Sequence, residues 1–163
     1  MGMIRISAEA RLAAPAADVY AVLADYRHHH PRILPPAFTS FGVEEGGVGA
    51  GTIIRFTVQT GGRTLHYRQR VEEPEPGRVL VERDLEKVAT TTFTVLPDGE
   101  GSSVRIDTAW QAGGVRGVIE RLLAPRMLTS LYRDELARLE AYALALPGAS
   151  AAEPAGAGAS TPA

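Results

Sequence analysis

The chain has 163 residues, a formal net charge of −2 at pH 7, 45% hydrophobic residues and no cysteine. This length and composition predict one globular domain with its own hydrophobic core. The charge argues against a nucleic-acid binder, which needs clustered positive charge, and the lack of cysteine excludes disulfides and thiolate metal sites. No stretch has the ~20 apolar residues of a membrane span, and charged residues interrupt any signal-peptide-like segment near the N-terminus, so we expect a cytoplasmic protein.

The first predicted element is a half-buried strand over residues 4–12, where apolar and polar residues alternate. Pro15 and Asp18 suit the first turn of a short helix that ends near Tyr26. A second short helix is expected over residues 28–33. Six closely spaced strands follow, and tight turns between them predict an antiparallel meander: Phe38–Glu45, Thr52–Thr60, Arg63–Glu73, Arg78–Asp84, Thr90–Leu96 and Ser103–Trp110.

The last predicted element is a long helix over residues 115–146, with an apolar side formed by Ile119, Leu122, Leu123, Leu128, Leu131, Tyr132, Leu136 and Leu139. Pro125 lacks an N–H and should kink this helix. Residues 147–163 contain no large apolar side chain, which predicts a disordered tail after a single folded domain over residues 1–146.

Hairpin geometry predicts which side chains share a face of the sheet, because directly opposite residues point to the same side. The turn at Gly61 pairs Phe56 with Tyr67, and the turn at Pro97–Ser102 pairs Phe93 with Ile106 and Thr91 with Thr108. A turn at Pro74–Gly77 would pair Val71 with Val79, Gln69 with Val81 and Tyr67 with Arg83. The opposite, solvated face would then carry Arg55, Arg68, Arg70, Glu72, Glu82, Asp84, Arg105 and Asp107.

The predicted inner face mixes apolar residues with Tyr67, Gln69, Arg83, Thr108 and Trp110. A sealed core rarely accepts arginine and glutamine together, because an unpaired buried polar group costs about 1–3 kcal/mol. Two interpretations follow. Either Arg83 and Gln69 satisfy each other or reach the rim, or they are the few polar groups of a mostly apolar pocket between sheet and helix.

The sequence resembles the START/Bet v 1-like (SRPBCC) superfamily, in its polyketide cyclase/dehydrase-like branch. The similarity lies in the first strand with residues 14–26, the glycine-rich residues 44–52 and the helical residues 134–140. The resemblance implies an α+β helix-grip fold: a curved seven-stranded antiparallel sheet wrapped around a long C-terminal helix, with two short helices after the first strand and a cavity between sheet and helix. Members include lipid carriers, quinone-binding proteins and polyketide cyclases, so the fold does not name the ligand.

Two other motifs resemble functional sites. The glycines of residues 46–51 precede a strand and lack the spacing of a phosphate loop, which favours a flexible hairpin loop at the pocket mouth. Three successive histidines, His28, His29 and His30, cannot converge on one metal ion from a helix, so we expect a surface cluster and no metal site. Of the three, His30 is a candidate acid or base near the cavity entrance.

The leading hypothesis is binding of a small hydrophobic or aromatic molecule, such as a lipid, quinone or polyketide-like compound, in an internal cavity. The expected ligand-binding residues are Phe56, Tyr67, Gln69, Arg83, Phe93, Thr108, Trp110 and Tyr132. The alternative is a cyclase or dehydratase in which Arg83 stabilises an oxyanion while Tyr67, Tyr132 or His30 moves a proton. A second alternative is an interaction module that acts through its surface. We expect no cofactor, and a monomer or homodimer.

Overall fold

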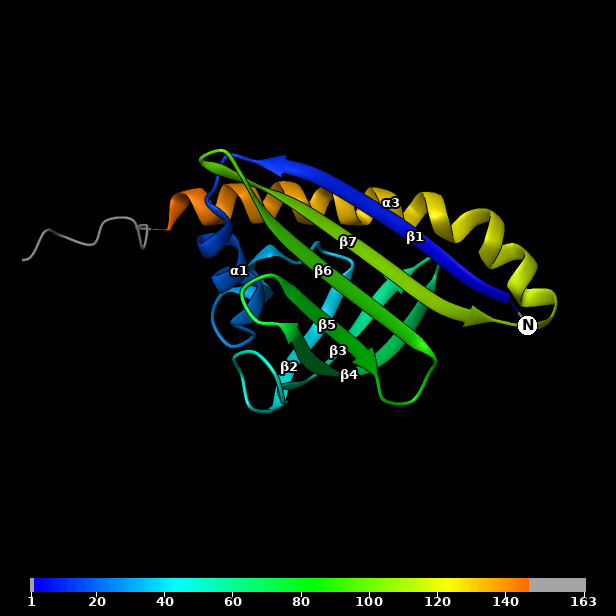
Figure 1. The fold of residues 1–163 in the computed structure, drawn as a ribbon. Helices are drawn as coiled ribbons and strands as arrows, with labels where there is room; N and C mark the ends of the chain where they lie inside the picture. Colours follow the sequence, from blue (N-terminus) through cyan, green and yellow to red (C-terminus); the bar gives the residue numbers. More distant parts are fainter. Residues whose placement is uncertain (1, 147–163) are drawn as a thin grey trace, which may run out of the picture.

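The computed structural model describes residues 2–146, except the side chains of residues 114–123. One antiparallel sheet of seven strands packs against one long helix, with two short helices at one end (Figure 1). The elements in chain order are β1 (Gly2–Leu12), α1 (Ala16–Ala24), α2 (His30–Ile33), β2 (Phe38–Glu45), β3 (Ile53–Thr60), β4 (Arg63–Glu75), β5 (Val79–Asp84), β6 (Ala89–Asp98), β7 (Gly101–Ala112) and α3 (Gly114–Ala145). This is the expected helix-grip architecture.

The strand order in the sheet is β1-β7-β6-β5-β4-β3-β2, so the first strand pairs with the last one and every other pair is a hairpin. The sheet curves around α3, which runs along its concave side (Figure 1). β1 alternates strictly, with Ile4, Ile6 and Ala8 buried between exposed neighbours, as its period of two predicts.

The core lies between this concave face, the short helices and the C-terminal half of α3. Leu136 and Leu139 of α3 are 2% and 1% exposed and pack with Leu23 of α1 and Ile106 of β7 in one hydrophobic cluster. Burial of an apolar side chain of this size contributes roughly 1.5–3 kcal/mol to folding, and this packing fixes α3 against the sheet.

Helix α3 continues through Pro125 as one element, and its first turns bend away from the axis of the rest (Figure 1). A bend at an internal proline is expected, since the ring removes a backbone donor and crowds the preceding turn. The expected apolar positions Ile119, Leu122 and Leu123 and the tail at residues 147–163 lie outside what the structure describes.

Two of the three predicted registers are confirmed. Phe56 lies opposite Tyr67 on β3 and β4, and Phe93 lies opposite Ile106 on β6 and β7. The β6–β7 register also places Thr91 opposite Thr108. Short turns leave little freedom of register when one face of each strand is buried.

The predicted register of β4 against β5 is wrong. Gln69 lies opposite Asp84 rather than Val81, and Val71 lies opposite Glu82 rather than Val79. The turn is centred on Pro76 and Gly77, where Arg78 N donates to Glu75 O at 3.0 Å and Gly77 has φ +83°. Proline followed by a positive-φ glycine is typical of a type II turn.

The position of this turn lengthens β4 past Pro74, with an irregularity between Glu72 and Glu75. A proline that cannot donate to the ladder is tolerated at such a place. The register moves by an odd number of residues, so every side chain of β5 changes face. Glu82 and Asp84 therefore point inward, and Arg83 points to solvent.

The glycine-rich loop before β3 is hydrogen-bonded to the end of α1 and to the residues after it. Tyr26 N donates to Gly47 O at 2.8 Å, and Gly49 N donates to Ala24 O at 2.9 Å. Glu73 Oε2 accepts from Ala50 N at 2.8 Å, while its Oε1 accepts from the hydroxyl of Tyr20 at 2.7 Å. These bonds anchor the expected hairpin loop to α1 and β4, and its flexibility stays a prediction.

Candidate ligand-binding site

Polar side chains gather on the concave face of the sheet, where most neighbours are apolar. Those that are at least nine-tenths buried come from four strands, two helices and the loop before β3: His30, Thr52, Gln69, Glu82, Asp84, Thr91, Ser102 and Glu135. Three of them, Glu82, Asp84 and Glu135, are carboxyl groups. Buried carboxylates are rare without a partner because ionisation in a medium of low dielectric constant is costly.

A hydrogen-bonded group links the short helices to β5. The hydroxyl of Tyr26, just after α1, donates to Glu82 Oε1 at 2.8 Å. The ring of His30 stacks on Tyr26 with centroids 4.5 Å apart, and its Nε2 lies 3.8 Å from the same carboxyl oxygen. His30 Nδ1 donates to Leu23 O at 2.7 Å, which leaves Nε2 without a proton in the neutral ring and facing Glu82.

Burial sets the protonation state of this group. It lowers the pKa of His30 to about 4, so the imidazole is neutral at pH 7 and the contact with Glu82 is not an ion pair. Burial raises the pKa of Glu82 to about 7, although the hydrogen bond from Tyr26 acts in the opposite direction. A carboxyl with such a pKa can give or take a proton near neutral pH.

Glu135 of α3 is the second buried carboxyl near this group. Burial first, and then repulsion from Glu82 and Asp134, raises its pKa to about 8. Glu135 is therefore a neutral acid at pH 7, and Glu82 is partly ionised. Because the two buried acids interact, they titrate as a coupled pair, and the pKa of each is raised.

Tyr132 of α3 closes a second chain of hydroxyl groups across the sheet. Its hydroxyl lies 2.7 Å from Thr108 Oγ1, which lies 2.9 Å from Thr91 Oγ1. Burial raises the pKa of Tyr132, so the phenol stays neutral, and either hydroxyl can donate in its bond with Thr108. These bonds hold α3 at a fixed distance from β6 and β7.

Aromatic rings form a wall at the β2–β4 side of the concave face. Phe56 stacks on Tyr67 with centroids 5.2 Å apart and an interplanar angle of 18°, and Phe38 and Phe41 lie 5.5 and 6.5 Å from Phe56. Nζ of Lys87, the only lysine in the chain, lies 4.2 Å from the centre of the Tyr67 ring. Such rings offer flat apolar surface and attract cations at their faces.

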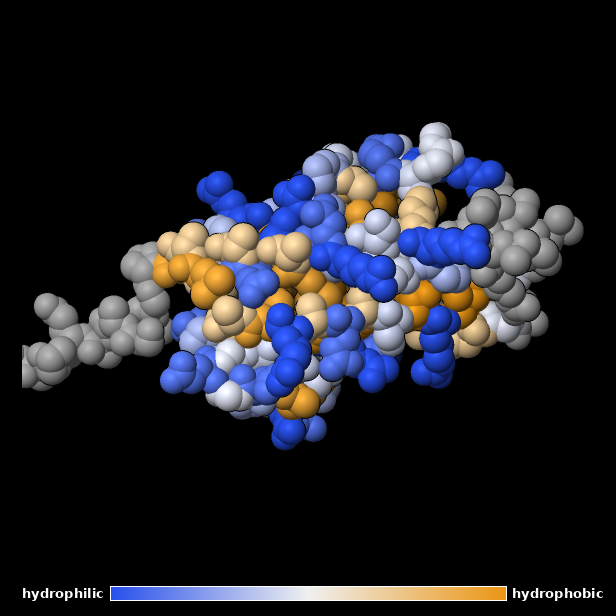
Figure 2. Space-filling view, turned by 90° about the horizontal axis from the view of Figure 1, so that it is seen from above, coloured by the Kyte–Doolittle hydropathy of each residue, from blue (hydrophilic) through white to orange (hydrophobic). Residues whose placement is uncertain are grey.

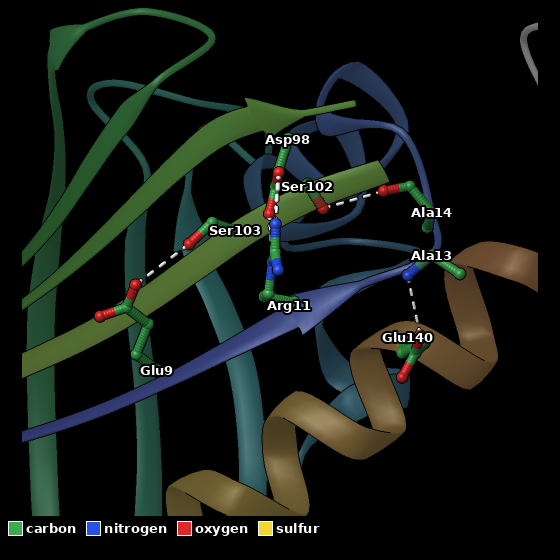
Figure 3. A network of polar contacts seen from close by, with 8 residues as sticks. All are labelled: Glu9, Arg11, Ala13, Ala14, Asp98, Ser102, Ser103 and Glu140. Carbon is green, nitrogen blue, oxygen red and sulfur yellow. Dashed lines mark hydrogen bonds and ion pairs between the residues drawn. The ribbon is translucent and has the colours of Figure 1, made fainter. Parts of the chain in front are cut away.

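Two shallow hollows lie on the outside of α3, away from this group. A hollow of about 160 Å³ between β1 and α3 is lined by residues such as Leu12 and Glu140, and a second one lies at Pro125 and Arg126. At one end of the first hollow Glu140 accepts a hydrogen bond from Ala13 N at 2.8 Å, whereas Arg11 pairs with Asp98 on the side of β1 away from α3 (Figure 3). Seen from above, hydrophobic side chains also gather at the C-terminal turns of α3, where Leu144 is 54% exposed (Figure 2).

Comparison with known proteins identifies the family. A family model described as "Polyketide cyclase / dehydrase and lipid transport" matches residues 3–144. The chain belongs to this family. The major pollen allergen Car b 1 isoform 2 of Carpinus betulus is 32% identical over 130 residues, which are 72% of this chain and 81% of the allergen.

Solved structures agree with this assignment. The solution structure of the KanY protein is 32% identical, with a TM-score of 0.78 over 88% of this chain and 99% of that chain. The Zhui aromatase/cyclase from Streptomyces sp. R1128 is 23% identical, with a TM-score of 0.62 over 87% of this chain and 92% of that chain, which shows the shared fold alone. The chain thus has the ligand-binding fold of the polyketide cyclase and lipid transport family.

The structure places most of the predicted site residues of this family member on or near the concave face. Phe56, Gln69, Phe93 and Tyr132 are buried there, and Tyr67, Thr108 and Trp110 are partly buried. Arg83 is the exception. Its side chain is 54% exposed on the convex face and pairs with Glu72 at 3.1 Å, so the predicted stack of Arg83 on Tyr67 is wrong.

The three successive histidines lie in different environments, which the sequence did not predict. His28 is exposed beside Asp25, and His29 Nδ1 meets the hydroxyl of Tyr142 of α3 at 2.9 Å, whereas His30 turns into the core. The expectation of a surface cluster is therefore wrong for His30, which lies deep rather than near an entrance. Among the side chains that the structure describes, no three His, Asp or Glu residues converge as metal ligands would.

Sequence reasoning missed Tyr26, Glu82, Asp84 and Glu135. The turn Glu75-Pro76-Gly77-Arg78 was the available signal for two of them, since a type II turn at Pro76-Gly77 sets the inward face of β5. Glu135 follows Tyr132 by three residues and precedes Leu139 by four, so the helical period that buries these two residues also turns Glu135 inward, and this spacing was the available signal. No helix within the described residues is long and apolar enough to cross a membrane.

Proposed function

We propose that the protein binds a small, largely apolar or aromatic molecule between the concave face of the sheet and α3. The observation that carries this proposal is the set of buried carboxyl groups, Glu82, Asp84 and Glu135, on an otherwise apolar face. Each buried polar group without a full set of partners costs about 1–3 kcal/mol. A face built only for packing would replace these groups with apolar residues.

The neighbouring residues fit such a ligand. The stacked rings of Phe56 and Tyr67 supply flat apolar surface for its body, and the hydroxyls of Tyr26 and Tyr132 supply polar contacts at fixed positions. A mostly apolar lining with a few placed polar groups is typical of small-molecule sites. The family description, which includes lipid transport, agrees with this chemistry.

Native mass spectrometry of the freshly purified protein tests the proposal first, followed by titration with the neutral fluorescent probe Nile red. We expect a discrete adduct or saturable probe binding. The variant Thr91→Phe fills the concave face and should abolish binding, whereas Thr92→Phe, on the other face of the same strand, should leave it unchanged. Absence of both an adduct and probe binding in the wild-type protein contradicts the proposal.

A second candidate is an enzyme that moves protons on a polyketide-like substrate. The observation that favours it is the carboxyl of Glu82, which has a pKa of about 7 and lies 2.8 Å from the hydroxyl of Tyr26. In this mechanism Glu82 takes a proton next to a carbonyl group, and the phenol of Tyr132 donates to the developing oxyanion. Arg83, assigned that role from the sequence, is on the wrong face.

Turnover of a linear 1,3,5-triketone distinguishes this enzyme from a carrier. Glu82→Gln keeps the shape and the acceptor for Tyr26 but cannot exchange a proton. We expect probe affinity within twofold of wild type and a rate at least 100-fold lower, as for the loss of a general base. An unchanged rate, or no turnover by the wild-type protein, rejects the enzymatic candidate and leaves binding.

A further inference from the structure

The second hollow on the outside of α3 is lined by hydrogen-bond donors from one face of the helix. It has a volume of about 330 Å³ and lies at Pro125, Arg126, Thr129, Ser130 and Arg133. The four polar residues are spaced i, i+3, i+4 and i+7, so they share one side of the helix. Arg126, Ser130 and Arg133 are exposed and Thr129 is half-buried, so these donors can reach a ligand in solvent.

The two arginines flank this hollow and the two hydroxyl groups lie between them. Seven residues separate Arg126 from Arg133, which is roughly 10 Å along the helix axis. Thr129 and Ser130 occupy the turn in between, and their side chains are short. Two long side chains on either side of two short ones account for the hollow. A small group in it can meet hydroxyls from below and guanidinium groups from both ends.

None of these four side chains has a hydrogen-bond or ion-pair partner among the residues that the structure describes. An exposed arginine one turn further along α3 is different, because Arg138 pairs with Asp134 at 3.1 Å. Arginines that pair with a carboxylate have their charge and their donors already engaged. The donors of Arg126 and Arg133 are free for a ligand.

The acids that come near the hollow make other contacts. Arg133 also lines the first hollow, together with Glu9 and Glu140. Glu9 accepts a hydrogen bond from the hydroxyl of Ser103 at 3.1 Å, and Glu140 accepts one from a backbone N–H of the segment after β1. Neither of these two acids forms an ion pair with Arg133 in the described part of the chain. The local charge of the second hollow is therefore positive.

These donors fit a phosphate group better than other anions. A phosphate monoester carries three terminal oxygens and a charge of about −1.5 to −2 at pH 7, so it can accept from two arginines and two hydroxyls at once. A carboxylate has two oxygens, which a single arginine fills in a bidentate pair. A nucleic acid needs a longer basic surface than two arginines supply, and the net charge of −2 opposes its binding.

We propose that this hollow binds the phosphate group of a monoester. The guanidinium groups of Arg126 and Arg133 hold its oxygens from both ends, and the hydroxyls of Thr129 and Ser130 donate from the floor. A soluble phosphate ester and the headgroup of a lipid such as phosphatidic acid both offer this chemistry. The site lies on the outside of α3, away from the concave face of the sheet, and does not depend on the proposed function.

The test is a titration with glycerol 3-phosphate and with acetate at pH 7, followed through the arginine Nε–Hε signals by nitrogen-15 NMR. We expect the signals of Arg126 and Arg133 to shift and to saturate, with an affinity at least about fivefold higher for the phosphate than for acetate. Arg126→Gln and Arg133→Gln should each weaken phosphate binding at least about fivefold. The double variant Thr129→Val, Ser130→Ala should weaken it about two- to threefold, as for neutral hydrogen bonds.

Arg63→Gln is the matched control, because it removes the same charge from an exposed position at the start of β4 and should leave phosphate affinity within about twofold. Sedimentation with phosphatidylcholine vesicles that contain phosphatidic acid separates the two sources. Binding to these vesicles without a response to glycerol 3-phosphate supports the site and assigns it to a lipid headgroup, and the reverse assigns it to a soluble ester.

Two results overturn the proposal. One is the absence of both a shift with glycerol 3-phosphate and sedimentation with the vesicles. The other is phosphate binding that Arg126→Gln and Arg133→Gln reduce no more than Arg63→Gln does, since the phosphate then lies elsewhere. Neither result bears on Nile red binding, which reports on the concave face.

Discussion

The hydroxyl of Tyr26 donates to Glu82 Oε1 at 2.8 Å, and this bond joins the segment after α1 to the concave face of β5. The two residues are 56 positions apart in the chain, and both are buried. The bond gives the buried carboxyl its one hydrogen-bond donor among the described residues. It also connects the glycine-rich loop to the site, because Tyr26 N donates to Gly47 O.

Tyr26→Phe removes that donor and leaves a buried acceptor unsatisfied. We expect a loss of about 1–3 kcal/mol in the free energy of unfolding, measured by urea denaturation at pH 7. The pKa of Glu82 should rise further, since the lost bond favours the ionised form, and carbon-13 NMR of the carboxyl checks this direction. Tyr142→Phe, which loses only a half-buried contact with His29, should change neither quantity by a comparable amount.

Glu135→Gln should change how stability depends on pH. The native state holds the proton of Glu135 to about pH 8, whereas the unfolded chain releases it near 4.5. The contribution of Glu135 is therefore complete below pH 4.5 and is lost as the pH rises through 8. As the pH rises between these values, the free energy of unfolding of the wild-type protein should fall by about 3–5 kcal/mol relative to that of Glu135→Gln.

Urea midpoints at pH 4.5, 6.5 and 8.5 measure this difference. Glu100→Gln is the control, because this carboxylate is exposed in the turn before β7 and is not among the groups that raise the pKa of Glu135. Its pH profile should follow that of the wild-type protein. Parallel profiles for the wild-type protein and Glu135→Gln contradict a buried, protonated Glu135.

Arg83→Ala should have little effect on either folding or binding. The arginine pairs with Glu72 on the convex face, and exposed ion pairs contribute about 0–1 kcal/mol. Nile red affinity should stay within twofold of wild type, as it should for Arg68→Ala, which breaks a similar exposed pair with Glu44. A large loss of Nile red affinity in Arg83→Ala but not in Arg68→Ala would contradict this prediction and support the inward-pointing Arg83 expected from the sequence.

Gly49→Ala should destabilise the protein more than Gly61→Ala does. Both glycines have positive φ, +64° and +53°, so each alanine is strained. Only at Gly49 would the new Cβ lie 2.4 Å from a Glu73 oxygen, which would break the bonds of Glu73 to Tyr20 and Ala50. We expect losses of about 2–4 and about 1 kcal/mol respectively, and thermal melting ranks the two variants.

The local pattern of the chain predicts most of the fold. Strict alternation in residues 4–12 predicts β1 and its buried face, because a period of two matches a strand with one solvated side. The two-residue turn at Gly61 predicts that Phe56 meets Tyr67, and the helical period predicts that Leu136 and Leu139 of α3 face the core. These features depend on contacts near in sequence or on a single periodicity.

The candidate site depended on tertiary structure. One turn decided which face of β5 carries Glu82, Asp84 and Arg83, since an odd shift in register reverses every side chain. The helical period places Glu135 on the buried side of α3, but only the packing of α3 on the sheet brings it near Glu82. The pKa values of Glu82, Glu135 and His30 follow from burial, which the sequence does not state. Burial raises the pKa of the two carboxyl groups into the range near neutral pH and lowers the pKa of the imidazole, which is therefore neutral at pH 7.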